Sequence, residues 1–103
     1  MSGKAHPLGH CQVVGDQMLP PSSGGGAAVC AEIEQAISSA APNVAYTAEI
    51  TVLSPSRLAA ALVVNGRRLP EQRFAIMDRE LNRGAIERFA RSLAAEVAKA
   101  AKP

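Results

Sequence analysis

The sequence lacks tryptophan and has few aromatic side chains of any kind, which limits the core that it can build. Its 103 residues contain one tyrosine and two phenylalanines, although 48% of the residues are hydrophobic. Aromatic side chains bury the most apolar area per residue, so a core with few of them gains less free energy from burial. We therefore expect one thin core in a single domain, for which a covalent cross-link adds a large share of the stability.

Long hydrophobic runs are also missing. No stretch approaches the roughly 20 apolar residues that a membrane-spanning helix needs. The first residues, 1–7, do not form the apolar run of a signal peptide. We expect no membrane span, and an exported form of this protein requires a leader that this sequence does not include.

Cysteine is scarce: the sequence contains two cysteines, Cys11 and Cys30. They bracket a segment, 19–26, made of turn-forming residues. A bond between them closes a loop of about 20 residues and stabilises the fold by roughly 3 kcal/mol in the chain-entropy model. Because such bonds persist in oxidising compartments, we favour a disulfide and a periplasmic or secreted protein. Free thiols in a cytoplasmic protein are the alternative.

A zinc site is a third interpretation of the cysteines, because His6 and His10 complete a set of four ligands with Cys11 and Cys30. The spacing is unfavourable, since neighbouring residues of an extended chain point apart and no CxxC pair is present. We predict no metal and no cofactor. A nucleophile needs a base beside it, and both histidines lie near an irregular N-terminus, so we predict no catalytic residue and no enzyme.

Hydrophobic periodicity predicts the element order β-α-β-β-β-α. We expect a flexible tail over 1–10, a short strand over 11–15 and a loop over 16–26 that acts as a flexible linker. Apolar residues at helical spacing predict a helix over 27–40. The whole domain spans 11–101.

The second half of the chain completes this α+β fold. Alternation of apolar and polar residues predicts strands over 44–53 and 58–64, joined by a turn. A last helix is expected from Arg79 onward, with Asn82 as an alternative start. The fold class is then an antiparallel meander sheet of three to four strands, covered on one face by two helices.

The third strand of the meander needs an irregularity. Asn65-Gly66 predicts a two-residue hairpin turn, which directs Leu69 toward the core. Continued regularly, this register directs Arg73 inward, although the apolar Phe74 has the other parity. Because Pro70 cannot donate a ladder hydrogen bond, we predict a break over 69–72 and an edge strand over 72–77.

Charge is unevenly distributed. Residues 57–91 contain eight arginines and four carboxylates, whereas 1–56 contain one lysine and four carboxylates. Adjoining predicted strands carry four of these arginines as a candidate interaction surface, namely Arg57, Arg67, Arg68 and Arg73. The alternative hypothesis is a cytosolic nucleic-acid-associated protein that uses this surface.

Taken together, these patterns favour a small non-catalytic binding or accessory domain, exported to the periplasm or cell envelope, with a role in protein interaction. We expect a protein partner at the sheet edge 72–77, rather than nucleic acid, and a monomer or weak dimer.

Overall fold

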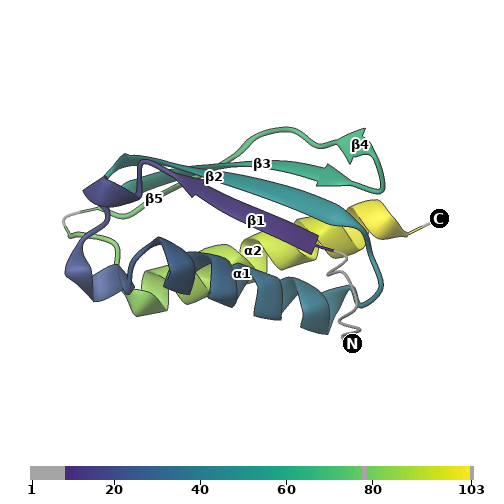
Figure 1. Cartoon of the computed structure of the whole chain (residues 1–103), viewed down its shortest axis with the longest axis horizontal. Helices are drawn as coiled ribbons and strands as arrows, with labels where there is room; N and C mark the ends of the chain where they lie inside the picture. Colours follow the sequence, from purple (N-terminus) through teal and green to yellow (C-terminus); the bar gives the residue numbers. More distant parts are fainter. Residues whose placement is uncertain (1–8, 78, 103) are drawn as a thin grey trace, which may run out of the picture.

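The computed structural model, which describes residues 9–77 and 79–102, places two helices against one face of a five-stranded sheet (Figure 1). This arrangement confirms the predicted α+β class. The elements in chain order are β1 (Gly9–Val14), the 3₁₀ helices η1 (Asp16–Met18) and η2 (Pro21–Ser23), α1 (Gly26–Ala40), β2 (Tyr46–Ser54), β3 (Arg57–Val64), β4 (Arg67–Arg68), β5 (Gln72–Ala75) and α2 (Arg83–Ala101).

The sheet is mixed because β1 joins it in parallel. The strand order is β1-β2-β3-β4, and β5 pairs with β3 beside β4. The meander of β2, β3, β4 and β5 is antiparallel, as predicted. Helix α1 carries the chain back along the sheet before β2 begins, so β2 runs in the same direction as β1.

The first strand begins earlier than the sequence suggests. Gly9 and His10 pair with Tyr46 and Thr47, so these two residues belong to the sheet and not to a tail. Gly9 has no side chain, which leaves room for the Tyr46 ring that lies where a Cβ atom would be. The rest of the predicted tail, 1–8, lies outside the described residues.

The core fills the space between the sheet and the helices. Alternate residues of β2 and β3 face the helices, and both helices contribute one apolar stripe each. The largest fully buried side chains are Phe89, Ile33, Ile37, Ile50, Leu58, Leu62, Leu81, Ile86, Leu93, Val29, Val52 and Val97. Branched aliphatic residues dominate this set, as the shortage of aromatics predicts.

The predicted hairpin is confirmed at Asn65-Gly66. Both residues have positive φ, 51° for Asn65 and 83° for Gly66, as the two central positions of a type I′ turn require. Val64 pairs with Arg67, and the Leu69 amide donates to the Leu62 carbonyl at 2.9 Å. This register directs Leu69 toward the core.

The predicted break is a β-bulge. The pairing of β4 with β3 aligns Pro70 with Ala61, whereas the pairing of β5 with β3 aligns Glu71 with the same Ala61. Two residues therefore oppose one, which reverses the inward and outward positions beyond them. Phe74 faces inward as a result, and its ring lies 5.3 Å from that of Phe89.

The bulge also explains the number of strands. It divides the third strand of the predicted meander into β4 and β5, so five strands replace the predicted three to four. Strand β5 ends at Ala75 and not at Met77. The Ile76 amide still donates to Ser56, but Met77 leaves the sheet and is 81% exposed.

The prediction that the last helix starts at Arg79 is wrong, because α2 starts at Arg83. The Asn82 side chain accepts a hydrogen bond from the Ala85 amide at 2.9 Å, which is an N-cap. Leu81 is buried, and its amide donates to the Pro55 carbonyl at 2.9 Å. This bond attaches Leu81 to the turn before β3, and no helical structure is assigned to residues 79–82.

The segment between β1 and α1 is ordered, and the expectation of a flexible linker is wrong. It forms η1 and η2, and Ser23 is buried with its hydroxyl donating to the Pro20 carbonyl at 2.7 Å. The Ser22 hydroxyl donates to the Leu81 carbonyl at 2.9 Å. The Ser22 hydroxyl thus attaches this segment to the chain in front of α2, and the Ser23 hydroxyl stabilises the segment internally.

The bulge predicts an unusual response to deletions. Removing Pro70 leaves Leu69 and Phe74 in their present registers and abolishes the bulge, so we expect a change below about 1 kcal/mol in the free energy of unfolding. Removing both Pro70 and Glu71 reverses the parity and expels Phe74, which lowers that free energy by about 2 kcal/mol. Urea denaturation of both variants measures the difference. Equal losses in the two variants would contradict the proposed register.

Candidate functional site

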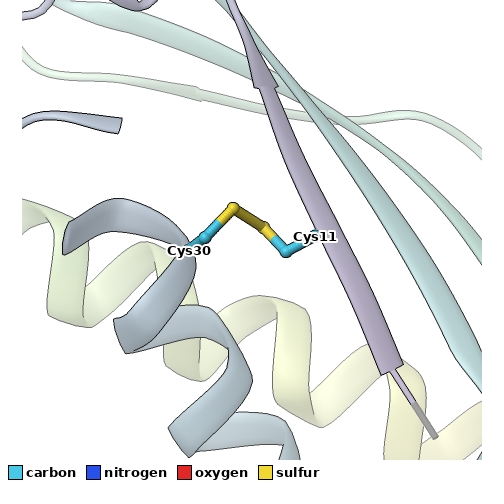
Figure 2. Close-up of a disulfide and its surroundings, with 2 residues drawn as sticks. All are labelled: Cys11 and Cys30. Carbon is cyan, nitrogen blue, oxygen red and sulfur yellow. A yellow bond between two sulfur atoms is a disulfide. The ribbon is translucent and has the colours of Figure 1, made fainter. Parts of the chain in front are cut away.

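Cys11 and Cys30 form the predicted disulfide, which joins the middle of β1 to α1 (Figure 2). Their sulfur atoms are 2.09 Å apart and their Cα atoms 5.6 Å apart. Both residues are half-buried, and Cys11 packs against the core. The disulfide thus fixes the edge strand of the sheet to the helix below it.

This bond removes the basis for a zinc site, because neither sulfur is available as a thiolate ligand. His10 lies on the exposed side of β1, opposite to Cys11, and His6 lies outside the described residues. Among residues 9–77 and 79–102, no group of three or more metal-ligating side chains comes together. The helices in the same ranges include none that is long and apolar enough to cross a membrane.

The structure brings together three of the four candidate arginines. Arg57, Arg68 and Arg73 lie on the sheet face that points away from the helices, opposite Ala75, Val63 and Ala59 respectively. Arg67 has the other parity, because successive side chains of a strand point to opposite faces. It lies beside the end of α2, in a cavity that Lys99 and Lys102 also line.

We call the outward side chains of the sheet the open face, because the helices lie on the other side (Figure 1). The open face consists of His10, Gln12, Val14, Thr47, Glu49, Thr51, Leu53, Arg57, Ala59, Ala61, Val63, Arg68, Arg73 and Ala75. An apolar row, Ala59, Ala61 and Val63, runs along its central strand. Its side chains are small, and the side chains on the neighbouring strands are larger.

The larger apolar side chains of the open face lie at one end of the sheet. Val14 is 42% exposed and Leu53 is 43% exposed. Val14 pairs with Thr51, two residues before Leu53 on the same side of β2, so the two apolar side chains are diagonal neighbours. They extend the apolar surface across β1 and β2.

The predicted docking edge, 72–77, is less accessible to a partner strand. A bulge and Pro70 interrupt it, and the Arg73 Nε atom donates to Glu71 Oε2 at 3.0 Å in an exposed ion pair. Bulges, prolines and charges are the features by which proteins prevent strand addition at an edge. The open face therefore offers the better surface for a protein partner.

A cavity of about 660 Å³ lies beside Tyr46, and no sequence pattern indicates it. Its wall comes from two segments that are distant in the chain: the start of β1, and the stretch from the end of α1 through residues 41–44 to the start of β2. Tyr46 is 8% exposed, and burial, followed by the nearby charge of Glu34, raises the pKa of its hydroxyl. The phenol is therefore a neutral hydrogen-bonding group at physiological pH. Only the tertiary fold brings these segments together.

Comparisons with protein-family models, curated proteins and solved structures return no match.

The disulfide predicts a redox-dependent stability. Replacing both Cys11 and Cys30 by alanine should lower the free energy of unfolding by about 3 kcal/mol, because the unfolded chain regains the entropy of the open loop. Urea denaturation with and without reductant measures this loss. The double variant serves as the control, since reductant should shift the wild type alone. Two thiols that react with an alkylating agent in the native wild type would contradict the bond.

Tyr46 predicts a loss of stability in alkaline solution. Its pKa in the folded protein is raised above 10.0, so its contribution is complete below pH 10.0 and is lost as the pH rises through the folded pKa. The unfolded phenol ionises first, which favours the unfolded state. Because the chain has one tyrosine and no tryptophan, tyrosinate absorbance reports this group alone. A Tyr46→Phe variant should lack this part of the pH dependence, and equal slopes in both proteins would refute it.

Proposed function

We propose that this protein is a non-catalytic binding domain that receives an acidic polypeptide segment on the open face. The observation that carries the proposal is the apolar row Ala59, Ala61 and Val63, which lies on the central strand β3 with helices on the opposite side only. Within this row Ala61 is exposed, Val63 is half-buried and Ala59 is 7% exposed. Apolar rows at the centre of a sheet are normally covered by another layer, and one without such a layer is typical of an interaction surface.

Charge selects the partner. Arg68 on β4 and Arg73 on β5 border the apolar row on one side, and Arg57 lies at the end of the row on β3 itself. The carboxylates on this side of the sheet are Glu49 and Glu71, and Glu71 forms an ion pair with Arg73. A segment that alternates apolar and acidic side chains complements this pattern, because its apolar side chains contact the row and its carboxylates meet the guanidinium groups.

Nucleic acid is the alternative partner, and the composition of the open face argues against it. The face has no phenylalanine, tyrosine or tryptophan on which a base can stack. Three arginines, one of them paired with Glu71, also make a small footprint for phosphate binding. Protein is therefore the partner that we propose.

Export is part of the proposal. The support is the disulfide between Cys11 and Cys30, because structural disulfides persist in the periplasm and outside the cell. We propose the periplasm or cell envelope as the location, with the cytoplasm as the alternative.

A peptide titration tests the proposal. Isotope-labelled protein is titrated with a synthetic peptide of alternating glutamate and valine, and amide resonances are followed by NMR. We expect shifts at Ala59, Ala61 and Val63, and none with a matched peptide of lysine and valine. The Arg68→Glu/Arg73→Glu variant should bind about tenfold more weakly, a loss of about 1.4 kcal/mol.

Arg67→Glu/Lys102→Glu is the control, because it makes the same charge change of four units at the cavity beside the end of α2, away from the open face. Equal loss in the control and in the Arg68→Glu/Arg73→Glu variant would refute the open face as the site. Absence of binding by the glutamate peptide would refute the acidic partner. Binding of a single-stranded oligonucleotide at the same residues, with a steep salt dependence, would favour the nucleic-acid alternative instead.

A further inference from the structure

Strand β1 is an edge strand without protection. Among the described residues it pairs with β2 alone, and its register runs without interruption over the six residues Gly9–Val14. The strand contains no proline, lysine, arginine, aspartate or glutamate. One side of its backbone therefore presents amide and carbonyl groups that have no partner strand.

The opposite edge of the sheet shows the contrast. There the bulge at Pro70 and Glu71 and the charged side chain of Arg73 prevent strand addition. The same protein thus blocks one edge in several ways and leaves the other regular. The disulfide at Cys11 also holds β1 on α1, so the strand is ordered before any partner arrives.

The helix beside this edge has a small-residue flank. Glu34 and Ser38 line a cavity together with Gly9, which shows that this side of α1 faces β1. Ala27 and Ala31 lie on the same stripe at helical spacing, and both are exposed. At the level of Cys30, the helix layer therefore presents methyl groups and no charge.

We propose that a second copy of this chain pairs through β1, with the two strands antiparallel. A two-fold axis perpendicular to the sheet and level with the disulfide joins the two sheets into one sheet of ten strands. Identical surfaces meet in such an interface. The backbone groups of both β1 strands gain partners, and the alanine flanks of both α1 helices approach each other.

Charge favours a second copy over a charged partner. The surfaces that meet carry no charged residue on β1 or at Ala27 and Ala31. Glu34 is the first charge on the flank, four residues from Cys30. At a rise of 1.5 Å per residue, the two copies of Glu34 are about 12 Å apart along the helices, beyond the Debye length in physiological salt. Each Glu34 instead lies near Ala27 of the other copy.

This interface does not use the open face, because the two-fold axis passes beside the backbone edge of β1, away from β4 and β5. It sets both open faces on the same side of the extended sheet. The dimer then presents two binding surfaces in one plane, which increases the avidity for a partner with repeated segments.

Sedimentation of the oxidised full chain over a concentration series tests the proposal. We expect a monomer–dimer equilibrium for the wild type. In Ala31→Arg, two guanidinium groups meet near the axis, and the dissociation constant should rise at least tenfold. Ala95→Arg is the matched control, since Ala95 is an exposed alanine on α2 and its replacement should leave the equilibrium unchanged. Circular dichroism verifies that both variants are folded.

Amide hydrogen exchange in β1 gives a second measurement. In a monomer alternate amides of the strand exchange fast, because alternate amides point away from β2. In the proposed dimer all of them are protected, and the protection increases with protein concentration. A wild type that remains monomeric at NMR concentrations overturns the proposal. So does a dimer that Ala31→Arg leaves intact.

Discussion

One constraint governs this structure: both helices lie on the same face of the sheet, so every strand has to turn its apolar side chains to that face. In β2, alternation meets this requirement, and in β3 the residues that face the helices, Leu58, Ala60, Leu62 and Val64, are all buried. In the third strand of the meander, Leu69 and Phe74 have opposite parity, and the bulge between them lets both face the helices. A thin aliphatic core leaves no room for a polar side chain at these positions.

The same constraint creates the candidate site. Side chains of the opposite parity form the open face, so the bulge that turns Phe74 inward also turns Arg73 outward, onto the same face as Arg68. The small side chains of β3 give this face its apolar row. Its surface chemistry is therefore a direct result of how the core is built.

The sequence was sufficient for features that depend on local chemistry. Turn formers located the hairpin at Asn65-Gly66, parity located the bulge at Pro70, and the pair Cys11 and Cys30 indicated the disulfide. Periodicity could not show that β1 runs parallel to β2, since alternation is the same in either direction. The cavity at Tyr46 was beyond prediction because its wall joins segments that are distant in the chain.

The start of α2 shows how a tertiary contact overrides helix propensity. The residues after Arg79 have adequate helical propensity, but Leu81 donates to the Pro55 carbonyl and the helix begins only after the cap at Asn82. The segment before α1 is similar, since Ser22 anchors it to the same region. The chain that connects the sheet to α2 thus also organises the loop after β1.

The disulfide determines how this domain responds to mechanical load. When the chain is pulled at its N-terminal end, Gly9 and His10 can peel from β2, and the force then reaches Cys11. It passes through the covalent bond to Cys30 and bypasses the intervening loop, including Pro20 and the glycines before α1. Rupture then requires α1 to leave the core as a whole, so the oxidised domain resists extension far better than its edge strand alone.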